Sequence, residues 1–159
     1  MTGASAGLGE QLGRALAACG AVPVLAARRA GRLSELAAEI PQAEVIACDV
    51  TRETDRERLI GTVIERHGRI DGLVNNAGIG AAGPALRTSA DAFARVIDLN
   101  LVAPYALSCL AARHMREGGG RSIVNVASVM GMRSVAQIAD AAYAKSGSTP
   151  WPRASSPPT

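Results

Sequence analysis

Short apolar runs alternate with segments of helical periodicity along most of the chain. Each run is rich in Val, Leu or Ile and is followed by a polar or glycine-rich turn, as expected of buried parallel strands. These runs predict strands at residues 21–27, 44–48, 72–75 and 122–126. The intervening periodicity predicts helices at residues 8–19, 32–40, 54–67 and 89–116, the last interrupted near Pro104. The pattern therefore predicts an α/β fold, a parallel sheet with flanking helices, and chemistry at the turns that follow the strands.

The last fourteen residues, SGSTPWPRASSPPT, differ from everything before them. They hold four of the eight prolines of the chain, and proline removes a backbone donor from a helix or an interior strand. We therefore expect one domain over residues 1–145 and a disordered Pro/Ser-rich tail over residues 146–159. A ligand for a proline-recognition domain, centred on Trp151, is the weaker alternative.

The composition is that of a folded protein, and it argues against a nucleic-acid partner. The chain has 159 residues, 48% of them hydrophobic and 19% charged, which is enough apolar material for one core. Its net charge of +3 is spread along the chain and forms no basic stripe. Aromatic residues make up only 3%, which leaves few side chains on which bases could stack.

Targeting and metal-binding signals are weak in this sequence. We find no apolar run that approaches bilayer-spanning length and no signal-peptide pattern at the start, so we expect a cytoplasmic protein without a membrane partner. Cys19, Cys48 and Cys109 form no CxxC pair and have no histidine at ligand spacing. They predict neither a disulfide framework nor a metal site.

A glycine-rich loop opens the first predicted helix. Residues 2–9 read TGASAGLG, with glycine at positions 3, 7 and 9. Glycine lets a backbone adopt positive φ and approach a pyrophosphate closely, and the following helix offers free N–H groups at the positive end of its dipole. The loop predicts a phosphate-binding turn, and a purely structural tight turn is the alternative.

Further motifs follow this loop in a fixed order, and together they resemble the short-chain dehydrogenase/reductase family. They are Asp49-Val50, Asn75-Asn76-Ala77-Gly78, Asn100, Ser128 and Tyr143. The resemblance extends from residue 2 to about residue 145. It implies a Rossmann-like, dinucleotide-binding domain and an oxidoreductase that interconverts a secondary alcohol and a ketone. It also implies a homo-oligomer for an intact member of the family.

The resemblance also assigns the residues that would bind a nicotinamide dinucleotide. The phosphates and the adjoining ribose would contact the glycine loop, at Gly3, Ser5, Gly7, Leu8 and Gly9. The adenine ring would lie against Asp49 and Val50. The adenosine side of the cleft would be lined by Asn76, Ala77 and Gly78.

The end of the first predicted strand favours NADP(H) over NAD(H). The strand ends in Ala26-Ala27-Arg28-Arg29, beside the expected position of the adenosine ribose. An acidic residue there would accept a hydrogen bond from the 2′-hydroxyl, whereas an arginine pairs with a 2′-phosphate. Arg28 and Arg29 are therefore predicted to select NADPH, unless they only form a solvated entrance to the next helix.

In this family, hydride transfer needs a proton donor, a polarising hydrogen bond and a nearby positive charge. By resemblance, Ser128 would bind the substrate oxygen and Tyr143 would exchange the proton. Asn100 would lie at an irregularity of its helix and hold a water that connects a lysine to solvent. The lysine would lower the pKa of Tyr143, which is near 10 in a free tyrosine.

The lysine is the point at which this sequence departs from the family pattern. The family pattern is Tyr-x-x-x-Lys, whereas the chain reads Tyr143-Ala144-Lys145 and has Gly147 at the expected position. A spacing of two places side chains about 200° apart on a helix, whereas a spacing of four places them about 40° apart. Lys145 is thus the candidate by residue type, but in a regular helix it cannot support Tyr143.

Both ends of the sequence also depart from the family pattern. Only Met1 precedes Thr2, so the first central strand is expected to be missing, together with the C-terminal elements. The loss would leave a gap of roughly 9 to 10 Å between the flanking strands, with unpaired backbone groups on both sides. We expect poor stability. A late translation start combined with a shifted reading frame would explain both ends, and so would a true fragment.

Three interpretations of function remain open from the sequence. The first is an NADP-dependent oxidoreductase acting on a small alcohol or ketone. The second is a protein that binds the dinucleotide without catalysis, which the altered spacing of Tyr143 and Lys145 would permit. The third is an inactive gene remnant that neither folds nor binds.

Overall fold

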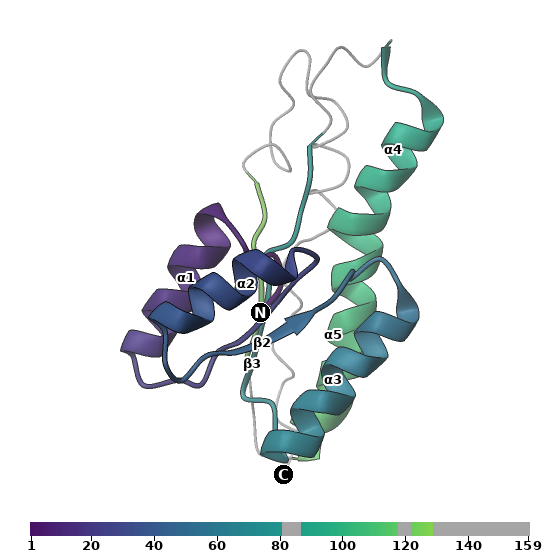
Figure 1. The fold of residues 1–159 in the computed structure, drawn as a ribbon. Helices are drawn as coiled ribbons and strands as arrows, with labels where there is room; N and C mark the ends of the chain where they lie inside the picture. The colour runs from purple at the N-terminus through teal and green to yellow at the C-terminus, as the bar shows by residue number, and fades with distance from the viewer. Residues whose placement is uncertain (81–86, 118–121, 129–159) are drawn as a thin grey trace.

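The computed structural model describes residues 1–80, 87–117 and 122–128. Helices and strands alternate along it, as predicted (Figure 1). The helices before the third strand are α1 (Gly7–Ala18), α2 (Ala30–Glu39) and α3 (Glu53–His67). The strands are β1 (Val24–Ala27), β2 (Glu44–Ala47), β3 (Gly72–Asn75) and β4 (Ser122–Asn125). A long helix composed of α4 (Ala90–Ile97), η2 (Asp98–Val102) and α5 (Ala103–Glu117) connects β3 to the region of β4.

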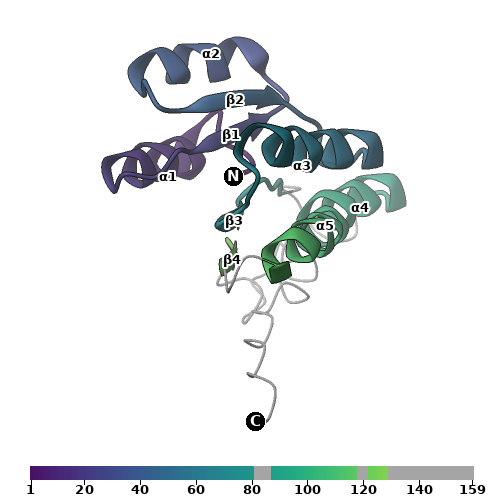
Figure 2. The same cartoon turned by 90° about the horizontal axis from the view of Figure 1, so that it is seen from below.

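The strands form two parallel pairs rather than one continuous ladder. β1 pairs with β2, from Val24 opposite Glu44 onward, and β3 pairs with β4, from Gly72 opposite Ser122 onward. Helices cover both sides of this arrangement, with α1 and α2 on one side and α3 and α5 on the other (Figure 2). The predicted α/β class is confirmed, with short parallel strands flanked by helices.

Residues Met1 and Thr2 lie between the two pairs at the end nearest the glycine loop. The carbonyl of Met1 accepts a hydrogen bond from the N–H of Ala26 (2.9 Å), and Thr2 forms a parallel bridge with Ala26. On the other side, the N–H of Thr2 donates to the carbonyl of Val74 (2.9 Å). The expected gap between the flanking strands is therefore closed at one end by two residues of the chain itself.

Two apolar clusters form the core, one on each side of the strands. Leu25, in β1, and Leu33, in α2, are fully buried in the cluster beneath α1 and α2. On the other side, Leu107 of α5 packs with Leu59 and Leu73. The core positions recur at helical spacing in α3 and α5, which explains why these helices are amphipathic and lie against the strands.

The long helix corrects the prediction of an interruption near Pro104. The chain instead forms a π-turn over η2, where the N–H of Ala103 donates to the carbonyl of Asp98, five residues earlier. Pro104 is the second residue of α5, directly after this turn, so its missing N–H falls where the hydrogen-bond pattern is already shifted. The helix thus continues through the proline.

The same continuous helix also bears on the membrane prediction. By length and composition alone, the helix over Ala90–Arg116 is long and apolar enough to cross a membrane. Of its most apolar 18-residue stretch, 28% is buried inside the protein. This differs from the expectation that no apolar run approaches bilayer-spanning length. Val96, Leu107 and Met115 from this helix lie in the core.

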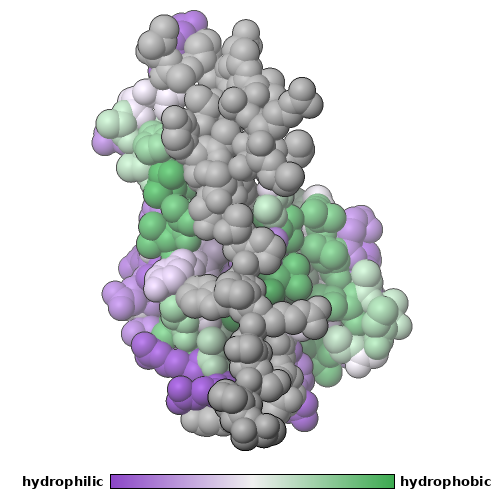
Figure 3. Space-filling model, turned by 180° about the vertical axis from the view of Figure 1, so that it is seen from behind, coloured by the Kyte–Doolittle hydropathy of each residue, from purple (hydrophilic) through white to green (hydrophobic). Residues whose placement is uncertain are grey.

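Apolar surface is also exposed in the part of the chain that the structure describes. Figure 3 shows much of it on the face opposite to that of Figure 1. The large apolar side chains that are exposed are Leu8, Val22, Ile79, Phe93, Val102, Tyr105 and Val124.

Candidate functional site

The glycine loop makes a close turn between Thr2 and the start of α1. Gly3 has a φ of +66°, and a Cβ added there would lie 2.8 Å from the Cα of Ala77. A Cβ at Gly9 would overlap the carbonyl oxygen of Gly3. Ala6, at the N-cap of α1, provides no side-chain acceptor for the first N–H groups of the helix. The first N–H groups of α1 therefore receive no side-chain cap from Ala6, which is the arrangement that an anion-binding loop requires.

The segment after β3 is fastened to this loop by hydrogen bonds. The hydroxyl oxygen of Thr2 accepts from the N–H of Asn76 (3.2 Å) and from the N–H of Ala77 (3.1 Å). The side-chain amide of Asn76 donates to the carbonyls of Thr2 (3.2 Å) and Gly3 (3.1 Å). Asn76 thus holds the walls of the site together, besides lining the site.

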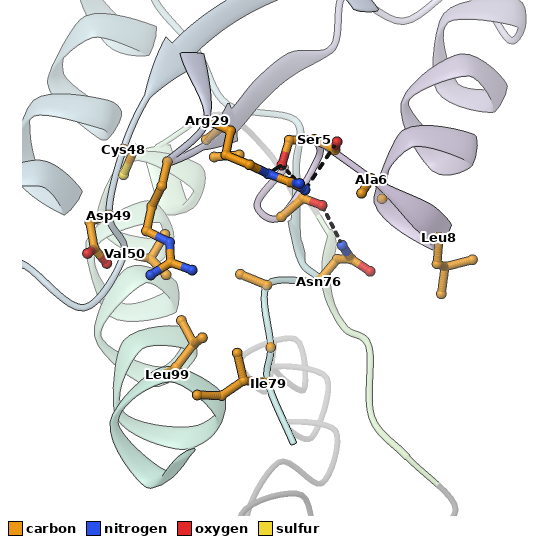
Figure 4. A pocket seen from close by; sticks show the side chains of 17 residues that line it. Ser5, Ala6, Leu8, Arg29, Cys48, Asp49, Val50, Asn76, Ile79 and Leu99 are labelled. Carbon is orange, nitrogen blue, oxygen red and sulfur yellow. Dashed lines mark hydrogen bonds between the residues drawn. The ribbon is translucent and has the colours of Figure 1, made fainter. Parts of the chain in front are cut away.

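Two neighbouring arginines at the end of β1 differ in what they contact. Arg29 donates to the hydroxyl oxygen of Ser5 through Nη2 (3.0 Å) and Nε (3.2 Å), which connects the glycine loop to β1 (Figure 4). Arg28 is exposed and forms no hydrogen bond or ion pair with any residue that the structure describes. The guanidinium of Arg28 is therefore available to a ligand.

The turn after β2 forms the opposite wall. Asp49 accepts hydrogen bonds at Oδ1 from the N–H (3.1 Å) and the hydroxyl (2.8 Å) of Thr51, and Val50 is buried beside it. Cys48 is also buried, and burial raises the pKa of its thiol to about 11. The thiol is accordingly neutral at pH 7 and contributes a small apolar surface.

These walls enclose a cavity of about 380 Å³. Every residue predicted to bind the cofactor lines it except Gly7: Gly3, Ser5, Leu8, Gly9, Arg28, Arg29, Asp49, Val50, Asn76, Ala77 and Gly78. The sequence reading missed six lining residues: Ala6, Ala26, Ala27, Cys48, Ile79 and Leu99. Four of them (Ala6, Ala27, Cys48 and Ile79) are direct neighbours, along the chain, of residues that were predicted, and Ala26 is two residues from Arg28, so adjacency was the available signal. Leu99 belongs to the long helix, and its proximity to the glycine loop is evident only from the folded structure.

Comparison with known proteins decides the family. A family model described as short chain dehydrogenase matches residues 1–151. The chain belongs to the short-chain dehydrogenase family. It shares the fold of a crystal structure of a short-chain dehydrogenase from Streptomyces avermitilis, with a TM-score of 0.88 and 34% identity over 92% of this chain and 54% of the other.

Named relatives of this short-chain dehydrogenase chain are dehydrogenases and reductases. It is 37% identical over 147 residues to an L-fucose dehydrogenase of Oryctolagus cuniculus, covering 91% of this chain and 50% of the relative. It is 37% identical over 134 residues to a meso-2,3-butanediol dehydrogenase of Serratia marcescens, covering 83% of this chain and 53% of the relative. The chain thus spans about half the length of these relatives.

Of the predicted catalytic residues in this short-chain dehydrogenase chain, the structure describes Asn100 and Ser128. Asn100 lies in the π-turn η2, so the predicted irregularity of its helix is present. Its buried side-chain amide accepts from the N–H of Ile79 (2.9 Å) and donates to the carbonyl of Ile79 (2.7 Å). Ser128 is partly buried in the segment after β4. Tyr143 and Lys145 lie outside the described residues.

Among the described residues, no group of three or more His, Cys, Asp or Glu side chains is arranged to hold a metal ion. Cys19 is exposed, Cys48 is buried and Cys109 is partly buried, all as free thiols. The polar chemistry of the described cavity is thus provided by backbone N–H groups, Ser5, Asp49, Asn76 and the two arginines.

Proposed function

We propose that this chain is the dinucleotide-binding part of an NADP(H)-dependent oxidoreductase that interconverts a secondary alcohol and a ketone. The observation that carries the proposal is Arg28, which is exposed and has no partner among the described residues, on the wall of a cavity built around the glycine loop. The named relatives act, by their names, on L-fucose and on meso-2,3-butanediol, and both compounds carry secondary hydroxyl groups.

The residues present fit such a dinucleotide. Gly3 and Gly9 leave room for close approach of a pyrophosphate, and the uncapped first turn of α1 offers N–H donors to it. Asp49 and Val50 form the wall assigned to the adenine ring. Bound in this cavity, NADP(H) would accept or supply the hydride.

Arg28 and Arg29 would divide the recognition of the adenosine ribose. Arg29 holds Ser5 and so sets the shape of the loop, whereas Arg28 is free to pair with a 2′-phosphate by charge-assisted hydrogen bonds. Neither residue is acidic, so the end of β1 provides no carboxylate to accept from the 2′-hydroxyl of NADH.

The other proposed roles concern the proton. Ser128 would hydrogen-bond the substrate oxygen, and Tyr143 would donate or accept the proton at that oxygen. Asn100, clamped on Ile79, would fix the loop after β3 beside the reacting groups. The role of Lys145 stays a prediction by residue type only. The cytoplasmic location, the limits of the domain and the homo-oligomer also stay predictions.

The test is a titration of the chain with NADPH and NADH, followed by cofactor fluorescence. We expect NADPH to bind more tightly, and Arg28→Asp to weaken NADPH by about tenfold or more while NADH changes far less, because a charge-assisted contact is lost. Arg113→Asp, an equal charge change at an exposed position of α5, is the matched control and should change neither affinity. Equal weakening of both cofactors by Arg28→Asp would contradict the proposal.

Dinucleotide binding without catalysis is the second candidate, favoured by the two-residue spacing of Tyr143 and Lys145. NADPH binding without oxidation in the presence of a panel of ketones would support it. A flat titration together with the circular dichroism spectrum of an unfolded chain would instead identify an inactive remnant.

A further inference from the structure

Charged side chains from the first turns of α3 hold the turn after β2 in place. Asp55 accepts at Oδ2 from the N–H of Asp49 (2.8 Å), and Arg58 donates to the carbonyl of Ala47 (2.7 Å). Arg56 donates through Nη1 to the carbonyls of Val50 (2.8 Å) and Thr51 (2.9 Å). The N–H of Asp49 and the carbonyls of Ala47, Val50 and Thr51 are therefore all bound to side chains of α3.

Arg56 differs from the other two because it is buried. It is 9% exposed, and its Nε is a buried donor with no hydrogen-bond partner among the described residues. A buried guanidinium with an unsatisfied N–H is a poor source of stability, since desolvation of the charge opposes the hydrogen bonds gained. Arg56 instead fixes the geometry of the turn, because its Nη1 alone donates to two successive carbonyls.

The backbone that Arg56 fixes carries one wall of the cavity. Asp49 and Val50 line the cavity, whereas Arg56 does not. The carboxylate of Asp49 is itself held by Thr51, whose carbonyl is bound to Arg56. A movement of the Thr51 carbonyl would therefore displace the side chain of Asp49 as well as Val50.

We propose that Arg56 is a positioning residue for the adenosine half of the cofactor. It holds the Asp49–Val50 wall at the position where the adenine ring binds, and it acts through that wall without touching the ligand. This inference rests on the proposed dinucleotide-binding function and adds to it a determinant outside the cavity.

The experiment compares three probes on the 159-residue chain and on Arg56→Met. NADPH spans the whole site, 2′,5′-ADP occupies the adenosine half, and reduced nicotinamide mononucleotide occupies the other half. We expect Arg56→Met to weaken NADPH and 2′,5′-ADP by the same factor, about tenfold, and to leave the mononucleotide unchanged. Arg56→Lys, which keeps the charge and can reach one carbonyl, should recover part of the loss.

The controls distinguish a specific effect on the Asp49–Val50 wall from a general loss of stability. Arg69→Met removes an exposed arginine that pairs with Asp71 and should change none of the three affinities. Unchanged NADPH binding in Arg56→Met, or an equal loss for all three probes, would overturn the inference and leave the proposed function standing. If Arg56→Met does not fold by circular dichroism, Arg56→Lys carries the same comparison. A wild-type chain that binds none of the probes removes the proposed function, and this inference with it.

Discussion

At the scale of single residues, Gly9 and Gly61 have different structural roles. Gly9 lies where the first turn of α1 crosses the glycine loop, and a Cβ there would overlap the carbonyl oxygen of Gly3 and approach Asn76. Gly61 lies in the middle of α3, and a Cβ there would meet nothing within 4 Å. The first glycine is required by close approach of backbone, whereas the second only weakens its helix.

Alanine at these two positions should therefore act in opposite directions. We expect Gly9→Ala to lower the free energy of unfolding by about 1–3 kcal/mol, because the loop and α1 must separate, and to abolish NADPH binding. Gly61→Ala, the matched control, should raise it by about 0.5–1 kcal/mol through helix propensity. Urea unfolding and an NADPH titration measure both. A Gly9→Ala chain that binds NADPH like the wild type would contradict this account of the loop.

The sequence predicted most of the residues that line the cavity, but it could not show how neighbouring residues divide their contacts. The glycines were predictable because positive φ and close approach leave few alternatives. The different contacts of Arg28 and Arg29 were not, because the direction of a side chain beyond the end of a strand depends on what lies across from it. Here that partner is Ser5, twenty-four residues earlier in the chain.

At the scale of elements, the β2–α3 turn depends on the ionisation of Asp55. The hydrogen bond from the N–H of Asp49, and then the guanidinium of Arg58, lower the pKa of Asp55 below its ordinary value. The folded state thus favours the carboxylate. The stabilisation is complete above the unfolded-state pKa of about 4 and is lost as the pH falls through the lower folded-state pKa.

Asp55→Asn should accordingly reduce the dependence of the free energy of unfolding on pH in the acid range. The amide keeps an acceptor for the N–H of Asp49 but does not titrate, so the free energy of unfolding should fall less steeply between about pH 5 and pH 3 than in the wild type. Glu57→Gln removes an exposed carboxylate from the same helix and should keep the wild-type slope. Urea unfolding at several pH values measures the slopes, and identical slopes for wild type and Asp55→Asn would refute the assignment.

The elements were predictable wherever hydrophobic periodicity alone sets them. β3 was predicted with its observed limits because it is a short apolar run followed by a polar, glycine-containing turn, and α3 was predicted within one residue of its start because its apolar positions recur at helical spacing. The long helix was predicted with an interruption near Pro104, and the structure has the π-turn η2 directly before it, through which the helix continues. That turn forms where Asn100 is held by Ile79 across the site, which is a tertiary contact.

At the scale of the whole molecule, two strand pairs depend on one short segment. The α/β class and the order of elements followed from the sequence, since alternating apolar runs and helical segments leave few other folds. The position of Met1 and Thr2 between β1 and β3 did not follow, because two residues carry no periodicity. Their contacts with Ala26 on one side and Val74 on the other are the backbone contacts that join the pairs.

Thr2 should therefore stabilise the molecule far more than an ordinary threonine does. Its hydroxyl is buried and accepts from the N–H groups of both Asn76 and Ala77, so Thr2→Val keeps the shape of the side chain but leaves two donors without an acceptor. We expect the free energy of unfolding to fall by about 1–3 kcal/mol, with faster amide exchange at residues 76 and 77. Thr54→Val, at an exposed position in α3, should change neither quantity beyond about 0.5 kcal/mol. If the two variants unfold at the same urea concentration, the hydroxyl of Thr2 does not stabilise this connection, and the backbone contacts of Met1 and Thr2 with Ala26 and Val74 maintain it without the hydroxyl.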